Sequence, residues 1–270
     1  MLKINTQYVK GVVCFVLLLL TLPLIQAQDA KKTAAGLYNE GLALLKAKNY
    51  ADGLITLEQA LTQAEADGNE KVIDLAKKNG AMAAYNLGNS KRTAKAYDEA
   101  AALYAKGKIM NPTYASNYIG AARVMDAKGD KEGALKAFLE AADKATSANS
   151  AKKTDEAFKR GKSVLTSLYN EKAYAKVVSL GKEFLAKSQN ADVNYYVGKS
   201  LMQTDGHADA VTHFDAALVA NPEKKDRVIY AKAQSLEKLG KNADAVAAYK
   251  MITDEKYKAN AAHKVTTLQK

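Results

Sequence analysis

The stretch that decides the fold runs from Asn190 to Pro222 and reads NADVNYYVGKSLMQTDGHADAVTHFDAALVANP. On both sides of Asp205-Gly206, apolar residues recur every three or four positions, which is the spacing of one helix face. The closing Asn-Pro ends the second helix, because proline has no amide hydrogen and clashes with the preceding turn. A lone helical hairpin cannot bury its apolar face, so this stretch predicts neighbouring hairpins of the same kind.

The same hairpin pattern recurs along the chain. Successive units start about 47, 34, 43, 33 and 35 residues apart, so three of the five intervals share one period and two carry insertions. The first insertion, 66–80, is expected to lengthen the following helix, and the second, 145–154, contains a loop at 147–150. Self-similarity at this period indicates a stacked solenoid.

Polar residues in the expected breaks predict where helices begin. Asn49 and Asp130 are the residue types that cap helix N-termini. After the sixth unit, 256–269 predicts one more helix with a single apolar face, which suits a terminal cap. The expected organisation is therefore a signal peptide (1–27), a repeat solenoid (28–253) and a C-terminal capping helix (254–270).

The residues at fixed places in these units resemble the tetratricopeptide repeat. The match is fullest at Val197, Gly198, Leu201, Ala210, Phe214, Ala217 and Pro222, and good at Leu87, Gly88, Tyr97, Ala100, Tyr104 and Pro112. The resemblance implies an all-α, right-handed α-solenoid of six helix-turn-helix repeats. The chain departs from the family in having no tryptophan, and Gly181 stands where the fourth unit should have its aromatic residue. We expect that unit to be distorted or to act as a hinge.

The N-terminal segment has the order of a secretory signal peptide. Lys3 and Lys10 precede the apolar run 11–25, which is followed by small and polar residues up to Ala27. We predict cleavage after Ala27 and export to the periplasm or the outer membrane. The run contains Pro23 and is shorter than the roughly 20 residues of a membrane-spanning helix. A retained anchor is therefore the weaker alternative.

Cysteine usage and charge restrict the function classes. Cys14, the only cysteine, lies in the predicted signal, so the mature chain would have no disulfide, no thiol nucleophile and no cysteine metal ligand. The formal charge of +11 falls to +9 when the two lysines of the signal leave. Such a balance is typical of proteins with anionic partners. Export argues against nucleic acid and favours an acidic protein segment or the phosphates of lipids and envelope glycans.

The three histidines, His207, His213 and His263, are the obvious catalytic candidates. Asp209 and His213 are four apart and could present two metal ligands on one helix, but no further ligand is suitably spaced. The hydrolase, P-loop and dinucleotide motifs are absent. We interpret the histidines as solvated surface residues and predict that the protein is not an enzyme and has no cofactor and no metal.

The resemblance implies that the first helix of each pair lines a concave face, which holds a peptide of a partner. The candidate contact residues beside the core face of these helices are Tyr38, Tyr85, Asn89, Arg92, Arg123, Lys162, Tyr169, Tyr195, Lys199, Tyr230 and Gln234. Tyrosine offers rigid apolar area, and arginine forks onto carboxylates, so an acidic peptide is expected. Alternatively, the tyrosines only pack against adjacent helices. The family's carboxylate clamp needs a lysine and asparagine set that Lys162 and Thr166 do not reproduce, so binding of chaperone tails is not predicted.

A second candidate surface is a basic patch. It consists of Lys152, Lys153, Lys159, Arg160 and Lys162. The patch could bind anionic envelope glycan or lipid headgroups, with association to a membrane surface, or it could simply be a solvated face. The sequence thus predicts a non-catalytic protein–protein interaction scaffold of the cell envelope, with the binder of anionic headgroups as the alternative.

Overall fold

The computed structural model describes residues 32–270, and within them every regular element is an α-helix. The predicted signal peptide lies outside the described residues. The helices are α2 (Ala34–Lys46), α3 (Tyr50–Ala66), α4 (Glu70–Thr93), α5 (Tyr97–Met110), α6 (Ala115–Ala127), α7 (Lys131–Ser147), α8 (Ala151–Asn170), α9 (Tyr174–Leu185), α10 (Ala191–Met202), α11 (His207–Val219), α12 (Lys225–Lys238), α13 (Asn242–Lys250) and α14 (Glu255–Leu268). No helix in this part of the chain is both long enough and apolar enough to cross a membrane.

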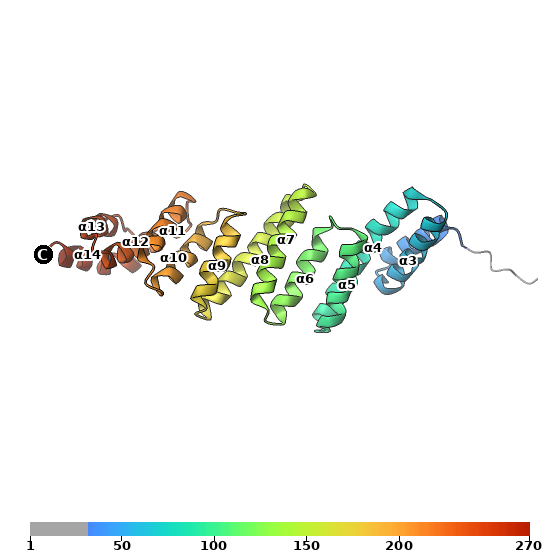
Figure 1. The fold of residues 1–270 in the computed structure, drawn as a ribbon, viewed down its shortest axis with the longest axis horizontal. Helices are drawn as coiled ribbons and strands as arrows, with labels where there is room; N and C mark the ends of the chain where they lie inside the picture. The colour runs from blue at the N-terminus through green and yellow to red at the C-terminus, as the bar shows by residue number, and fades with distance from the viewer. Residues whose placement is uncertain (1–31) are drawn as a thin grey trace, which may run out of the picture.

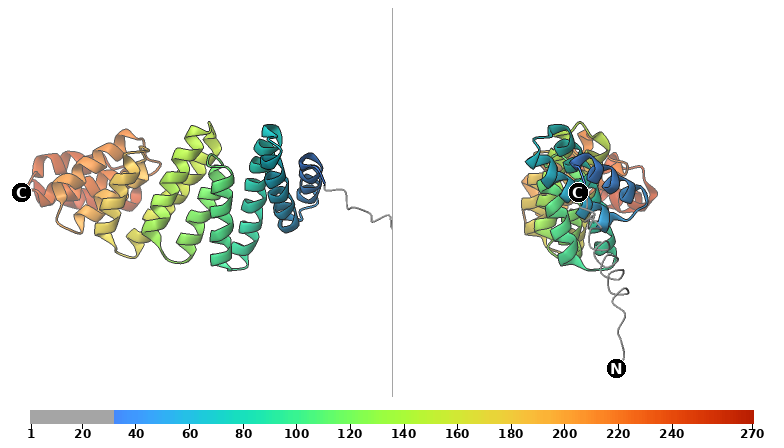
Figure 2. Two further views of the ribbon diagram at one scale, coloured as in Figure 1. Left: turned by 45° about the vertical axis from the view of Figure 1, so that its right-hand side comes forward. Right: turned by 90° about the vertical axis from the view of Figure 1, so that its right-hand side faces the viewer.

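The helices pair in chain order into six hairpins, α2/α3 through α12/α13, and each hairpin packs on the next. The result is an elongated row with α3 near one end and α14 at the other (Figures 1 and 2). The all-α solenoid predicted from the sequence is confirmed. The expected terminal helix is also present, because α14 packs on α12 and α13.

The turn inside each hairpin sets the register of the repeat. One residue in every such turn has a left-handed backbone, with φ between 57° and 86°. These residues are Lys48, Lys95, Gly129, Lys172, Asp205 and Gly240. They are 47, 34, 43, 33 and 35 residues apart, so the predicted intervals are confirmed.

Local signals in the sequence are also met. Asn49 and Asp130 cap α3 and α7, and the Asp130 carboxylate accepts a hydrogen bond of 2.9 Å from the Gly133 amide. Both insertions become helix: α4 has 24 residues and α8 has 20. The loops left between these long helices and their predecessors are only 67–69 and 148–150.

Within a hairpin, a glycine of the first helix faces a large side chain of the second. A Cβ added to Gly198 would lie 2.6 Å from Cε1 of Phe214, and one added to Gly88 would lie 2.8 Å from Cε1 of Tyr104. Phe214 and Tyr104 are fully buried. The glycines therefore permit the close approach of the two helices that the repeat pattern predicted.

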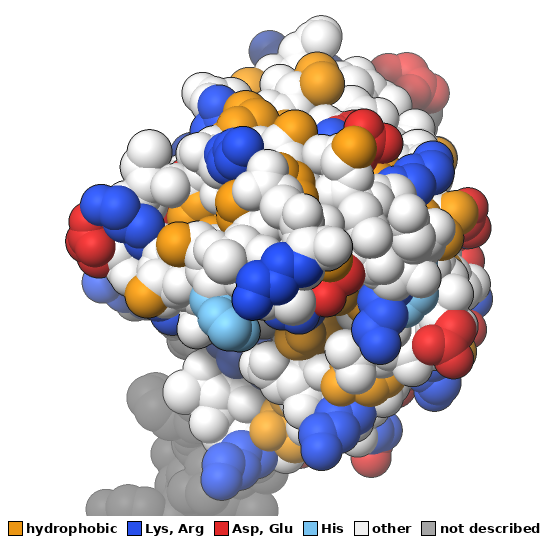
Figure 3. Space-filling model, turned by 90° about the vertical axis from the view of Figure 1, so that its left-hand side faces the viewer, with side chains coloured by type: hydrophobic (Ala, Val, Ile, Leu, Met, Phe, Trp, Pro, Cys, Tyr) orange, Lys and Arg blue, Asp and Glu red, His pale blue; other side chains and the backbone are white. Residues whose placement is uncertain are grey.

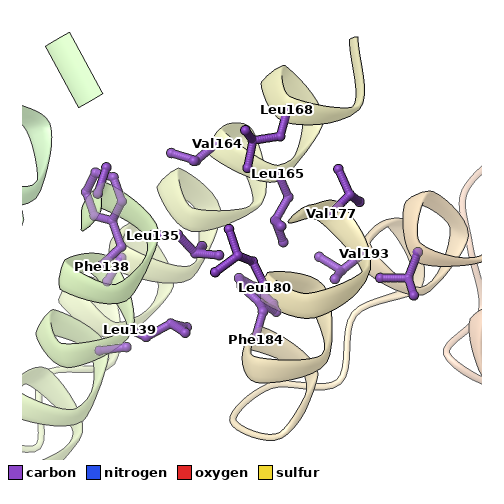
Figure 4. Close-up of a cluster of buried hydrophobic side chains, with 14 of the residues drawn as sticks. Leu135, Phe138, Leu139, Val164, Leu165, Leu168, Val177, Leu180, Phe184 and Val193 are labelled. Carbon is purple, nitrogen blue, oxygen red and sulfur yellow. The ribbon is translucent and has the colours of Figure 1, made fainter. Parts of the chain in front are cut away.

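The fourth hairpin, α8/α9, inverts this arrangement of large and small residues. Gly181 takes the place of the aromatic residue, while Phe184, three residues later, takes the place of an alanine. Leu165 stands where other hairpins have a small residue on the first helix. All three are buried, and Phe184 packs between α7 and α8 (Figure 4). The unit differs from the other hairpins in which positions hold large side chains and which hold small ones, but its core is filled.

The C-terminal end of the stack is closed by α14. Ala261 is buried there against Tyr249 and Ile252, with Tyr257 packed alongside. On this end of the molecule, basic side chains are interspersed with apolar side chains and with fewer acidic ones (Figure 3). The surface of the cap is therefore polar and mixed, as a terminal repeat requires.

Candidate interaction surface

The first helices of the hairpins form the inner side of the stack. They contact one another along its whole length, from α2 and α4 to α12 and α14, whereas among the second helices only α7 and α9 do so. Helices that lie closer together line the shorter arc, so the first helices line the concave face. All eleven predicted contact residues lie on these helices, and all are partly exposed.

Several of the predicted tyrosines are committed to packing. The ring of Tyr195 lies 5.5 Å from that of Tyr196 and 6.1 Å from that of Phe214, and the Arg227 guanidinium covers it at 4.4 Å. Burial raises the pKa of Tyr195 to about 12. Tyr169 likewise packs on Tyr196, at 5.1 Å between ring centroids. For these tyrosines the alternative interpretation, packing against neighbouring helices, describes the structure.

The remaining tyrosines differ in their surroundings. Tyr230 packs between Tyr249 and Tyr257 and so belongs to the contact with the cap. The hydroxyl of Tyr38 accepts a hydrogen bond of 3.1 Å from Asn79 on α4. Each of these side chains thus contacts the next unit along the stack: Tyr38 contacts the second hairpin and Tyr230 contacts the terminal helix.

Tyr85 lies on α4, in the second of the six hairpins. Its ring is 6.2 Å from that of Tyr104 and 6.1 Å from that of Tyr114. The Tyr104 hydroxyl donates a hydrogen bond of 2.9 Å to Asn89. Two predicted contact residues, Tyr85 and Asn89, thus lie beside the same buried ring.

Lys162 is occupied by a partner within the chain. Its Nζ lies 2.8 Å from the Asp192 carboxylate, whose other oxygen is 2.6 Å from Nη2 of Arg227. Burial opposes ionisation of Asp192, but Lys162 and Arg227 together hold its pKa below the ordinary value. Lys162 therefore belongs to an ion-pair bridge across α8, α10 and α12, and its contact with a partner stays a prediction.

The sequence interpretation missed Asp192 and Arg227. A signal was present, since each lies three residues before a tyrosine, Tyr195 or Tyr230, at the same place in successive units. Opposite charges at equivalent places in neighbouring repeats are candidates for an ion pair between those repeats.

Arg92, Arg123 and Arg160 form what we term the arginine cluster, on the neighbouring helices α4, α6 and α8. Burial lowers the pKa of Arg123, and the charges of Arg160 and Arg92 lower it further. Neither Arg92 nor Arg123 forms an ion pair with any carboxylate of residues 32–270. The Nε of Arg92 is buried and has no hydrogen-bond acceptor in the described part of the chain.

Glu156 neutralises part of the predicted basic patch. One of its oxygens lies 2.8 Å from Lys153 Nζ and the other 3.3 Å from Arg160 Nε. With Lys162 paired to Asp192, three of the five patch residues have carboxylate partners. A hollow of about 430 Å³ lies along this side of α8. It is lined by Lys152, Asp155, Glu156, Lys159, Arg160 and Ser163.

Lys199 remains without an ion pair among the described residues. It lies on α10 and is partly exposed, and burial of its stem lowers the pKa of the ammonium group. A desolvated cation without a counter-charge is unfavourable, and a carboxylate placed beside it would relieve this cost.

The interpretation of the histidines was wrong for two of the three. The His207 side chain is only 14% exposed, and His213 Nδ1 lies 2.9 Å from Oδ1 of the buried Asn194. Burial lowers the pKa of His213. Asn194 needs a hydrogen-bond partner in the core, which is a structural role for His213. Only His263 is exposed, and within residues 32–270 no three His, Cys, Asp or Glu side chains group as a metal site.

Comparisons with known proteins were made at the level of sequence and of structure. No protein-family model matches it, and no curated protein matches it in sequence. Among solved structures it is similar to YrrB, titled a TPR protein with an unusual peptide-binding site, with 17% identity over 64% of this chain and 84% of that one and a TM-score of 0.39.

Two further structures are similar in the same way. One is the C-terminal part of a TPR repeat-containing protein from Cytophaga hutchinsonii, with 14% identity, 79% and 76% of the two chains covered and a TM-score of 0.43. The other is PilF from Pseudomonas aeruginosa, with 14% identity, 87% and 96% covered and a TM-score of 0.39. The chain's own six equivalent turns and its glycine–aromatic contacts define its fold as an α-solenoid of six helical hairpins, closed by a terminal helix. Its repeats resemble the tetratricopeptide repeat.

Proposed function

We propose that this protein is an exported, non-catalytic scaffold that holds an acidic segment of a partner protein on its concave face. The observation that carries the proposal is the set of unpaired cations on that face: Arg92, Arg123 and Lys199 have no carboxylate partner among the described residues. Partly buried cations without counter-charges favour an anionic ligand, and charge-assisted hydrogen bonds are among the stronger polar contacts.

The rigid helices around these cations support the same function. Tyr85 and Asn89 lie on α4 with Arg92, so a bound segment would meet an aromatic edge and an amide as well as positive charge there. Preformed helices lose little conformational freedom on binding, which leaves more of the contact energy as affinity.

Charge reversal tests the proposal. We expect the triple variant R92E, R123E and K199E to lose capture of the partner after cross-linking in the native envelope. The matched control is K176E, K182E and K250E, which makes the same change in net charge at exposed lysines of second helices. Equal capture by both variants would remove the concave face from the proposal.

Localisation belongs to the same proposal. The basic, apolar and small-residue order of the first 27 residues supports export and cleavage after Ala27. Intact mass of protein purified from the envelope should then begin at Gln28. A mass beginning at Lys3 or earlier would contradict cleavage and favour a retained anchor.

The alternative, binding of anionic glycan or lipid headgroups, has less support. In the basic patch only Lys152 and Lys159 lack ion pairs among the described residues. Envelope binding that weakens strongly with salt, without any co-purifying protein, would favour this alternative over the scaffold.

A further inference from the structure

Arginine is rare in this chain and confined to one face. Of the 40 basic side chains only four are arginine, and all four lie on first helices: Arg92 on α4, Arg123 on α6, Arg160 on α8 and Arg227 on α12. Lysine provides positive charge everywhere else. Because the guanidinium group presents a planar fork of donors that matches a carboxylate, this placement indicates recognition of planar anions rather than general solubility.

Three of the four arginines lie on neighbouring helices, and two of them, Arg92 and Arg123, have no ion pair among the described residues. α6 contacts both α4 and α8. Gly88 on α4 and Gly120 on α6 both face the Tyr104 ring, and Arg92 and Arg123 each lie one helical turn beyond these glycines. The charges of Arg160 and Arg92 also lower the pKa of Arg123. The carboxylate paired in this cluster is Glu156, and it is shared with Lys153. By contrast, Arg227 has Asp192 at 2.6 Å and lies over the Tyr195 ring.

We infer that the arginine cluster is the anion-binding subsite of the concave face, and that it takes an extended segment of a partner protein with several acidic side chains. The inference rests on the proposed function and specifies its ligand. The three arginines lie on successive first helices, α4, α6 and α8, and these helices contact one another in that order. An extended segment in the polyproline II conformation advances about 3.1 Å per residue without internal hydrogen bonds, so along the concave face it can present carboxylates to arginines of successive helices.

Glu156 acts as an internal competitor at this subsite. Its carboxylate pairs with Arg160 and Lys153, the positions that an acidic ligand would use. Removing its charge with Glu156→Gln should strengthen binding of an acidic peptide, since the ligand no longer has to displace an existing ion pair. A purely structural role for Glu156 would give the opposite result, a loss of binding together with a loss of stability.

The small number of arginines makes the test direct, because a ¹⁵N-labelled protein has only four Nε–Hε signals. Single Arg→Lys variants assign them. The probe is a synthetic peptide with glutamate at every third position and proline and threonine between, and the control peptide has glutamine instead. We expect the glutamate peptide to move the signals of Arg92, Arg123 and Arg160 along one saturable curve, with Arg227 unmoved and no response to the glutamine peptide.

Affinities then test the geometry. Arg123→Gln should weaken the glutamate peptide roughly tenfold or more, as expected for a lost hydrogen bond to a charged group. Arg123→Lys keeps the charge but lacks the planar fork of donors, so it should recover only part of the affinity that Arg123→Gln loses. Circular dichroism and urea unfolding of each variant report whether the fold is intact.

Four results would overturn the inference. The cluster signals could stay unmoved at millimolar glutamate peptide, or Arg227 could respond as strongly as the cluster. Inorganic phosphate could also move the signals as much as the peptide at equal concentration, which would make the site one for small anions. If the variant R92Q, R123Q and R160Q still captures the native partner, the subsite falls while the proposed function stands.

Discussion

At the scale of single residues, the turns inside the hairpins are the most regular feature of the chain. In the first turn, the amide of Asn49 donates to Leu44 O and that of Lys48 to Leu45 O, which is the Schellman pattern at a helix C-terminus. The pattern recurs at Lys95 and Lys172. Lysine in this left-handed conformation is strained by about 1–2 kcal/mol relative to glycine.

Replacing one of these lysines with glycine should therefore stabilise the protein. For Lys95→Gly we expect a gain of up to about 1 kcal/mol, since relief of the left-handed strain exceeds the entropy that glycine adds to the unfolded chain. Urea unfolding measures the change. The control Lys78→Gly, in the middle of α4, should lose about 1 kcal/mol; two variants of equal stability would contradict the role of the turn.

The glycines facing aromatic rings predict the opposite behaviour. Gly198→Ala should destabilise by about 1–3 kcal/mol, because its new Cβ meets the buried Phe214 ring at 2.6 Å. Gly36→Ala near the start of α2 would meet only Thr33 Oγ1, at 3.3 Å, and a small shift of that side chain accommodates the new methyl, so this variant should lose much less stability than Gly198→Ala. Thermal unfolding of the two variants provides the comparison, and a Gly198→Ala protein that melts like the parent would refute the close contact.

At the scale of elements, the fourth hairpin shows how a repeat tolerates exchanged residue sizes. Gly181 leaves room for Val197 on α10, and Phe184 fills the space beside Phe158, with 5.4 Å between the ring centroids. The volumes are redistributed, so the core remains closed. Interior packing depends on total volume and shape more than on the identity of one position.

This arrangement predicts coupling between Gly181 and Val197. Gly181→Ala alone should cost about 1–3 kcal/mol, because the new methyl meets the Val197 side chain. In the background of Val197→Ala, the same substitution should cost much less. A double-mutant cycle by urea unfolding measures the coupling, and additive losses would show that the two sites do not meet.

One carboxylate of α12 holds the segment that leads into α14. Asp226 accepts hydrogen bonds of 2.6 Å from the amides of Thr253 and Asp254. The backbone hydrogen bond from Asp254 lowers the pKa of Asp226 below its unfolded value. The contribution is therefore fully present above the unfolded pKa of about 3.9 and is lost as pH falls through the folded value.

We accordingly expect Asp226→Asn to loosen residues 251–256 at neutral pH, and the parent to loosen there only in acid. Hydrogen exchange at residues 253–256 as a function of pH measures this, with intrinsic rates corrected. The capping carboxylate of Asp130, on the distant α7, provides a comparison within the same sample. Unchanged hydrogen exchange at residues 253–256 in Asp226→Asn would show that Asp226 does not hold this segment in place.

At the scale of the whole molecule, each hairpin contacts only its neighbours in the row, so the stability of the stack is close to one-dimensional. The buried cluster at the C-terminal end, with Ile229, Tyr249 and Ile252, is covered by α14. Removing residues 254–270 should expose this cluster. Amide exchange should then speed up in α12 and α13, while α4 to α7 stay as protected as in the full chain; a uniform loss of protection would instead indicate a globally cooperative fold.

The sequence by itself determined the elements and their order. The turn residues, the caps Asn49 and Asp130, and the one-sided apolar pattern of 256–269 are local signals. Each acts within about ten residues, so the hairpins, their recurrence and the terminal helix could be predicted. The concave placement of the eleven candidate residues came from the resemblance to the tetratricopeptide repeat.

The tertiary structure alone decided which of those residues are free to meet a partner. Lys162 pairs with Asp192, 30 residues away, and Asp192 with Arg227, 35 residues away, whereas Arg92 and Arg123 have no ion pair among the described residues. His213 pairs with the buried Asn194 and is therefore partly buried. Such pairings depend on how far each hairpin is rotated on the next, which the period within one hairpin does not encode.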